Sequence, residues 1–156
     1  MTRKIDALLA EYGESHQNST NKAIHWICVP VIVWTVAAIL WSLPTPAAFK
    51  SIPNVTWLMP VLALAVLYYI VLSWKLAIGF VIYAMACLWL IVFYEQNFSM
   101  PLWQFALIVF VVAWIGQFYG HKVEGKKPSF FKDVQFLLIG PAWLLHFLYK
   151  RFGISY

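Results

Sequence analysis

The stretch WICVPVIVWTVAAILWSL, residues 26–43, carries no charged residue and is long enough to cross a lipid bilayer as a helix. A spanning helix needs roughly 20 mostly apolar residues, and about 17–25 are tolerated. Three more uncharged apolar runs follow it, at residues 57–74, 76–94 and 102–119. The sequence therefore predicts an all-α, polytopic membrane bundle with four spanning helices.

The composition supports a membrane protein. Of the 156 residues, 63% are hydrophobic and 11% are charged, whereas soluble domains average about 45–50% apolar and 25% charged residues. The length predicts that residues 1–156 form a single integral-membrane domain. The net charge of +5 does not indicate nucleic-acid binding, because the basic residues are few and lie at the ends of apolar runs. Cys28 and Cys87 stand alone in such runs, which disfavours a disulfide framework or a cysteine zinc site.

Two shorter segments flank the four runs. Residues 3–12 predict a short amphipathic helix, whose apolar residues at helical spacing are Ile5, Leu8, Leu9 and Tyr12. A fifth apolar run, residues 134–149, is short for a span. Gly140-Pro141 interrupts its middle, and proline removes a helical hydrogen bond. We expect this C-terminal segment to be kinked, re-entrant or interfacial.

The distribution of Lys and Arg predicts the orientation. With four crossings, the N-terminal segment, Lys75 and the lysines of residues 120–133 lie on one side, and the other side carries only Lys50. Because basic residues mark the cytoplasmic side, we expect the N-terminus and the 120–133 loop in the cytoplasm. The short chain, with no obvious ER-retrieval tail, favours a bacterial inner membrane over the endoplasmic reticulum of a eukaryote.

A polar stretch, YGESHQNSTN at residues 12–21, stands directly before the first run. Tyr12 and His16 are four residues apart, as are Asn21 and His25, so each pair shares a helix face. The polar residues between the pairs predict a break in the helix, with Ser19 or Thr20 able to cap the next helix. A turn at this break would bring the two histidines together.

A third histidine, His121, follows the fourth run and lies on the same side of the membrane. Glu124, three residues later, is able to face the same point. Two histidines and one carboxylate with open positions are typical of non-haem Fe(II) oxygenases. Tyr12, Asn21 and Gln117 are candidates for orienting the ligands, which normally donate their second N–H to an acceptor.

Simpler interpretations stay open at this point. The histidines could be ordinary interfacial residues, and Glu124 could pair with a nearby lysine. His146 lies in the apolar context WLLHFL, and we expect it to bond a neighbour or to lie at the interface.

Taken together, these residues resemble the membrane family of 2-hydroxy-fatty-acid dioxygenases, related to a yeast enzyme of the endoplasmic reticulum that acts in phytosphingosine α-oxidation. The first block is Tyr12-x3-His16-x4-Asn21-x3-His25-x4-Pro30. The second, about ninety residues later, is Gln117-Phe118-x-Gly120-His121-x2-Glu124-x3-Pro128. The resemblance covers nearly the whole chain, including Gly140-Pro141. The chain departs from the family at Cys28, where glycine is usual and would set close helix packing.

The resemblance implies an Fe(II)-dependent dioxygenase that converts a 2-hydroxy fatty acid and O2 to a fatty acid one carbon shorter. It implies that His16, His25 and His121 bind iron, with Glu124 as a fourth ligand or a support and Tyr12 and Asn21 assisting catalysis. The expected partners are the hydroxy acid, O2 and membrane lipid. Chain length, stereochemistry and oligomeric state stay open.

Three alternatives remain. The first is a non-enzymatic lipid-binding or scaffold protein, the second is a zinc-dependent membrane hydrolase, and the third is a haem held by His25 and His121. A membrane di-iron hydroxylase or desaturase is excluded, because that pattern requires eight or more histidines and the chain has four.

Overall fold

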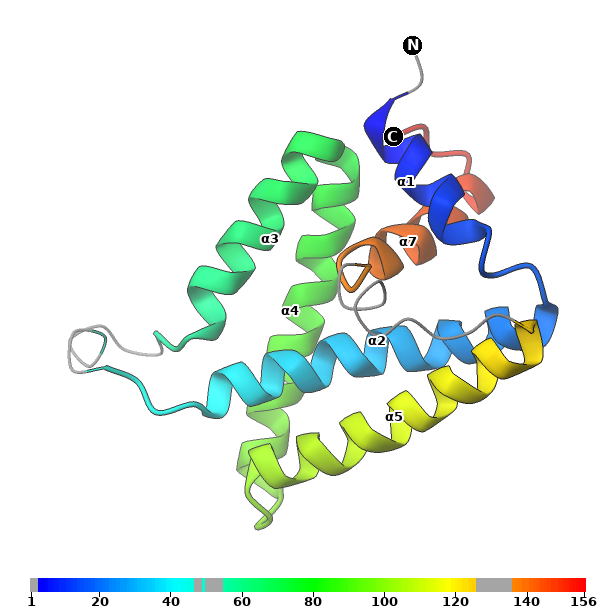
Figure 1. Cartoon of the computed structure of the whole chain (residues 1–156). Helices are drawn as coiled ribbons and strands as arrows, with labels where there is room; N and C mark the ends of the chain where they lie inside the picture. The colour runs from blue at the N-terminus through cyan, green and yellow to red at the C-terminus, as the bar shows by residue number, and fades with distance from the viewer. Residues whose placement is uncertain (1–2, 47–48, 50–54, 126–135) are drawn as a thin grey trace.

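The computed structural model describes residues 3–46, 49, 55–125 and 136–156, and these residues form helices and their connections without a strand. The predicted all-α class is confirmed over this part of the chain. The helices, shown in Figure 1, are α1 (Lys4–Gly13), α2 (Ser19–Ser42), α3 (Leu58–Leu72), α4 (Trp74–Asn97), α5 (Leu102–Glu124) and α7 (Ile139–Arg151).

Three helices, α2, α4 and α5, are long and apolar enough to cross a membrane. The second predicted span, residues 57–74, forms the shorter helix α3 of 15 residues. At 1.5 Å per residue α3 is about 22 Å long, less than the roughly 30 Å of the hydrocarbon core. A single residue, Ser73, separates α3 from α4 and its hydroxyl caps α4 by accepting from the Leu76 N–H. The two helices therefore form a tight hairpin (Figure 1).

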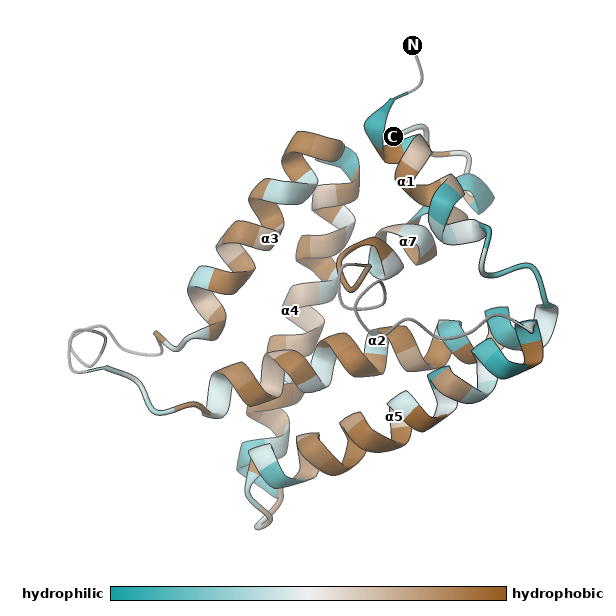
Figure 2. Cartoon of the chain, in the orientation of Figure 1, coloured by the Kyte–Doolittle hydropathy of each residue, from teal (hydrophilic) through white to brown (hydrophobic). Residues whose placement is uncertain are grey.

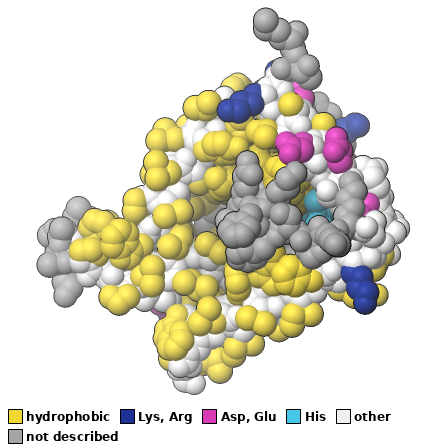
Figure 3. Space-filling model, viewed as in Figure 1, with side chains coloured by type: hydrophobic (Ala, Val, Ile, Leu, Met, Phe, Trp, Pro, Cys, Tyr) yellow, Lys and Arg dark blue, Asp and Glu magenta, His cyan; other side chains and the backbone are white. Residues whose placement is uncertain are grey.

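The surface of the described residues is largely apolar. Figure 2 shows hydrophobic residues along most of α2 to α5 and hydrophilic residues gathered where the N-terminal end of α2 meets the C-terminal end of α5. Figure 3 shows hydrophobic side chains over much of one face. Large exposed apolar residues include Leu64, Val71, Trp89 and Val112. Such a surface suits contact with the hydrocarbon core of a bilayer, whereas monomeric soluble proteins rarely expose large contiguous apolar patches.

The helices α2 and α5 run antiparallel and form the most extensive helix contact (Figure 1). Two glycines of α5, four residues apart, allow this approach. A Cβ at Gly116 would lie 2.8 Å from Cys28 Sγ, and one at Gly120 would lie 2.4 Å from Asn21 Oδ1. Small residues at this spacing let helix backbones come close in membranes. Cys28 of α2 therefore packs over Gly116.

The predicted break between α1 and α2 is confirmed, but its cap differs from the prediction. Asn18, rather than Ser19 or Thr20, caps α2: its Oδ1 accepts from the backbone N–H of Thr20 and, at longer range, of Asn21. An asparagine Oδ1 is among the strongest N-terminal caps because it reaches donors that have no partner within the helix.

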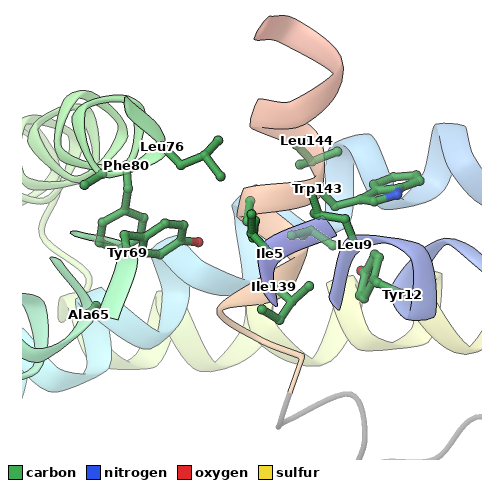
Figure 4. Close-up of a cluster of buried hydrophobic side chains, with 13 residues drawn as sticks. Ile5, Leu9, Tyr12, Ala65, Tyr69, Leu76, Phe80, Ile139, Trp143 and Leu144 are labelled. Atoms are coloured by element: carbon green, nitrogen blue, oxygen red, sulfur yellow. The ribbon is translucent and has the colours of Figure 1, made fainter. Parts of the chain in front are cut away.

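The amphipathic character of α1 is also confirmed. Figure 4 shows Ile5, Leu9 and Tyr12 of α1 close to Ile139 and Trp143 of α7. Leu8 is partly buried against the same cluster. The packing of α1 on α7 fixes the position of the polar residues that follow α1.

The expected interruption at Gly140-Pro141 takes the form of a helix start. Because α7 begins at Ile139, Pro141 lies in the first turn, where a missing N–H leaves no helical hydrogen bond unmade. A Cβ at Gly140 would lie 2.9 Å from Val29 Cγ1, so glycine lets α7 approach α2. Residues 134–135 of the predicted run lie outside the described residues.

Substituting Gly120→Ala tests the α2–α5 contact. The added methyl displaces the Asn21 amide, so we expect the free energy of unfolding in detergent to fall by about 1–3 kcal/mol. Gly13→Ala is the matched control, because its Cβ meets nothing nearer than Trp143 Nε1 at 3.8 Å. Equal denaturation midpoints for the two variants would contradict this packing.

Candidate metal centre

Three buried histidines converge where α1, α2 and α5 meet. His16 lies in the α1–α2 connection, His25 two turns into α2, and His121 one turn before the end of α5. Each offers a ring nitrogen, and these atoms all lie within 4.8 Å of one another. The ring centroids are 4.2 Å apart for His16 and His25, 5.1 Å for His25 and His121, and 5.7 Å for His16 and His121. The predicted meeting of the three imidazoles is therefore observed.

Backbone carbonyls set the orientation of two of the rings. His16 Nδ1 lies 2.6 Å from the Tyr12 carbonyl oxygen, and His25 Nδ1 lies 2.9 Å from that of Asn21. A carbonyl oxygen only accepts, so in each neutral ring Nδ1 carries the proton and Nε2 carries the lone pair. Both bonds span four residues, which is the spacing that the sequence predicts for Tyr12–His16 and Asn21–His25. The acceptors of these two hydrogen bonds are the backbone oxygens of Tyr12 and Asn21 and not their side chains.

The Tyr12 ring stabilises His16 by stacking. Its centroid lies 4.2 Å from that of the imidazole, with an angle of 12° between the planes. Trp143 of α7 lies 5.3 Å away at a tilted angle. Tyr12 and Trp143 also contact each other, with ring centroids 5.5 Å apart, so α7 also supports the site. The contribution of Trp143 was not predicted, because its sequence neighbours indicate only an apolar segment that is kinked, re-entrant or interfacial.

Glu124 lies beside the histidines and is not in the group of converging ligand atoms. Its Oε1 accepts from the backbone N–H of Gln17 at 2.9 Å. Its Oε2 accepts from the backbone N–H of Asn18 at 2.9 Å and from Asn21 Nδ2 at 3.0 Å. The carboxylate thus joins the end of α5 to the start of α2. These bonds favour the supporting role over the ligand role, and they leave no need for a lysine partner.

Asn21 is the central polar side chain at this junction. It is fully buried, and Nδ2 donates both to Glu124 and to the Ser15 carbonyl at 3.1 Å. Among the described residues its Oδ1 has no hydrogen-bond partner. Since Asn21 also accepts from His25 Nδ1 through its backbone, one residue links the carboxylate of α5 to the imidazole of α2.

Gln117 lines a small cavity next to His25. The side chain is 6% exposed, and its Oε1 makes no hydrogen bond within the described part of the chain. The cavity holds about 30 Å³, and its other lining residues include Tyr12, Val29, Trp114 and Gly140. This volume is enough for a water-sized group, which needs roughly 10–15 Å³ of such space. A buried acceptor beside a small cavity is suited to binding a ligand donor.

The fourth histidine is separate from this group. His146 lies on α7, where its Nδ1 bonds the hydroxyl of Tyr156. Partial burial lowers the pKa of His146, and Lys150 acts in the same direction. The expectation that His146 bonds a neighbour is confirmed. Both cysteines are free thiols, Cys28 half-buried and Cys87 buried.

The donor set fits one first-row transition metal ion. Imidazole suits zinc, copper, iron and nickel, and three nitrogens about 2.1 Å from one ion lie roughly 3–4 Å apart. In the structure the three nitrogens lie within 4.8 Å of one another, so small rotations of the rings would bring them to these separations. A haem between His25 and His121 does not fit, because His16 packs against both rings and leaves no space for a porphyrin.

The chain matches one family model over almost its entire length. This model, described as 2-hydroxy-palmitic acid dioxygenase Mpo1-like, covers residues 2–152, which include the three histidines, Glu124 and Gln117. No curated protein and no solved structure matches the chain. The resemblance found in the sequence is therefore confirmed: the chain belongs to the Mpo1-like family of 2-hydroxy-palmitic acid dioxygenases.

Proposed function

We propose that this protein is an Fe(II)-dependent membrane dioxygenase that shortens 2-hydroxy fatty acids by one carbon. The observation that carries the proposal is the convergence of His16, His25 and His121 at a buried junction, in a chain whose family is described as 2-hydroxy-palmitic acid dioxygenase. The three imidazoles would hold the ion on one side and leave its remaining positions open, as in other non-haem iron oxygenases.

The proposed reaction balances without a further co-substrate. R–CH(OH)–COOH and O2 give R–COOH, CO2 and H2O, and the C1–C2 bond breaks. Carbon C2 loses three electrons and C1 loses one, and O2 takes up all four. Bound Fe(II) would supply the binding positions and the electron transfer between substrate and O2. No 2-oxoglutarate is required, because the substrate is itself an α-hydroxy acid.

In this proposal the protein's own groups orient the histidine rings and fix the backbone around them. The Tyr12 and Asn21 carbonyls hold the His16 and His25 rings with Nε2 toward the common point. Glu124 is a positioning residue, because it fixes the backbone around His16 and the side chain of Asn21. Such supporting partners commonly affect metal affinity by 10–100-fold.

Gln117 is the proposed acceptor for the substrate's 2-hydroxyl group. Its buried Oε1 lines the cavity beside His25, and burying an acceptor without a donor costs about 1–3 kcal/mol. A substrate hydroxyl in this cavity would satisfy it. A fatty acid without the hydroxyl would leave it unsatisfied, which gives selectivity for 2-hydroxy acids.

A zinc-dependent hydrolase is the alternative that the donor set also permits, since imidazole binds zinc well. The two functions differ in their need for O2. Metal-depleted protein supplied with Fe(II) should consume O2 in the presence of 2-hydroxypalmitate, and protein supplied with Zn(II) should not. A non-enzymatic scaffold predicts neither bound metal nor O2 uptake.

The antiparallel contact of α2 and α5 supports four crossings. If these two helices cross in opposite directions, the chain between them must start and end on the same side. Since α4 is long enough to cross, α3 must then cross as well, and the bilayer can thin locally around a short helix. We propose a multi-pass protein with the metal centre at the cytoplasmic face.

Each of the changes His16→Ala, His25→Ala and His121→Ala is expected to lower bound iron by more than about tenfold and to abolish formation of the shortened acid. The reason is that two imidazoles hold an ion far less tightly than three. His146→Ala is the control and should keep both properties. Metal analysis and mass spectrometry of products test this, and full activity of His121→Ala would refute the ligand set.

The change Glu124→Gln should weaken iron binding by roughly 10–100-fold while leaving the three ligands present. Excess Fe(II) should therefore restore product formation in Glu124→Gln but not in His25→Ala. If iron rescues neither variant, Glu124 acts as a ligand rather than as a support.

The change Gln117→Leu should leave the iron content intact and raise KM for 2-hydroxypalmitate by about three- to tenfold, because a hydrogen bond contributes roughly 0.5–1.5 kcal/mol. Inhibition by palmitate, which lacks the hydroxyl, should be unchanged. Equal weakening of both ligands would show that Gln117 does not bind the hydroxyl group.

A further inference from the structure

We propose that the apolar hollow between α2, α4 and α7 binds one acyl chain of an anionic phospholipid, with the phosphate at Lys75 and Arg151. The lipid is a structural partner and not the substrate, so this inference goes beyond the proposed function and does not depend on the reaction. It follows from the apolar walls of the hollow, from its opening toward the bilayer and from the two cations at one end.

The hollow is apolar and separate from the metal centre. Its volume is about 310 Å³, and the described residues that line it carry no charge. They include Val29, Pro30, Ile82, Ala86, Leu144 and Leu148. The Tyr83 hydroxyl, which also lines the hollow, donates to the Pro30 carbonyl at 2.6 Å. Val29 is buried and packs on Gly140, so it forms a wall between this hollow and the cavity beside His25.

The hollow opens toward the lipid. Among its lining residues Ile82 is 59% exposed, Trp26 39% and Leu148 38%, and α2 and α4 are long enough to cross a membrane. The hydrocarbon region holds no water to fill such a space, and an empty hollow would forfeit van der Waals contacts of its walls. On α4 the lining extends from Gly79 to Ala86, about 10 Å along the helix, which is within the roughly 15 Å depth of one leaflet. An acyl chain of the bilayer is therefore the occupant that fits.

Two cations lie one helical turn beyond the hollow. Lys75 precedes Gly79 of α4 by four residues, and Arg151 follows Leu148 of α7 by three. These spacings place each cation on the side of its helix that faces the hollow or flanks it. Both lie at the same end, because the Tyr149 hydroxyl donates to the Lys75 carbonyl at 2.6 Å. In the proposed topology this end is cytoplasmic, so a chain in the hollow brings its headgroup to these two side chains.

The chemistry of the two side chains selects an anionic headgroup. Arg151 is exposed, and a guanidinium binds phosphate through two parallel hydrogen bonds. The Lys75 ammonium donates to the Ser155 carbonyl, and its three N–H donors allow it to bind phosphate as well. Cations gathered at the cytoplasmic surface attract anionic lipids. Phosphatidylcholine, whose quaternary ammonium cancels the phosphate charge, should bind less tightly than phosphatidylglycerol.

A lipid chain in this hollow contacts both sides of the packing that supports the metal centre. Val29 of α2 packs on Gly140 of α7, and the ring of Trp143 lies 5.3 Å from that of His16 between centroids. Because a ligand that binds only the folded protein stabilises it, the lipid holds α7 against α2.

The first test measures thermal unfolding of the full-length protein in detergent with added phosphatidylglycerol or with phosphatidylcholine of the same acyl chains. Phosphatidylglycerol should raise the midpoint at least about 3 °C further, the shift that a tenfold difference in affinity gives in a protein of this size. The double change Lys75→Gln with Arg151→Gln should abolish this difference.

The matched control is Lys4→Gln with Lys122→Gln, which removes two exposed charges from α1 and α5 and should keep the difference between the lipids. Each variant is compared with itself in the two lipids, so a change in its own stability does not affect the result. Equal midpoints in the two lipids for the wild type, or a difference that persists without Lys75 and Arg151, would overturn the inference.

The second test locates the chain with a phosphatidylglycerol that carries a diazirine on one acyl chain. After photolysis, mass spectrometry should find labels at Ile82, Ala86 and Leu148, competed better by phosphatidylglycerol than by phosphatidylcholine. Ala86→Phe fills the hollow with a ring and should reduce these labels. Ala63→Phe, which adds the same ring to an exposed site on α3 outside the lining, should not.

Other occupants would give different results. Competition of the labels by 2-hydroxypalmitate would assign the hollow to the substrate, and an unlabelled hollow in a dimeric protein would assign it to a second copy of the chain. Either result would overturn the lipid site. Neither would affect the proposed function, which is tested by metal content and O2 uptake.

Discussion

The candidate centre is arranged around the Glu124 carboxylate, which joins the last turn of α5 to the residues at the start of α2. It accepts from two backbone N–H groups and from the Asn21 amide, and Asn21 in turn orients His25. Gly120 permits this arrangement because any larger residue would displace the Asn21 side chain. Segments about one hundred residues apart in sequence thereby place their histidines at one point.

Much of this arrangement could be predicted from the sequence because its signals are periodic or local. Uncharged runs predict membrane helices, and the four-residue spacing of Tyr12–His16 and Asn21–His25 reflects a helical repeat that the two hydrogen bonds follow. The convergence of His121 with His16 and His25 followed from placing both ends of the bundle on one side of a membrane. These inferences need only chain geometry and charge.

Other features could not be predicted because they depend on packing between distant helices. The sequence does not distinguish Asn18 from Ser19 as a cap, and it cannot show that Gly140-Pro141 starts a helix rather than bending one. The support of His16 by Trp143 and the packing of Cys28 on Gly116 require the positions of three helices. The length of α3 also depends on the cap at Ser73, after which α4 begins. Composition alone does not give the position of this cap.

The central claim is that His16, His25 and His121 bind one ion together, and X-ray absorption at the iron edge tests it most directly. Anaerobically Fe(II)-loaded protein should show imidazole scattering from about three nitrogens at roughly 2.1 Å, and this signal should weaken by one nitrogen or vanish in His25→Ala. Iron without imidazole scattering, or an unchanged spectrum in that variant, would contradict the account.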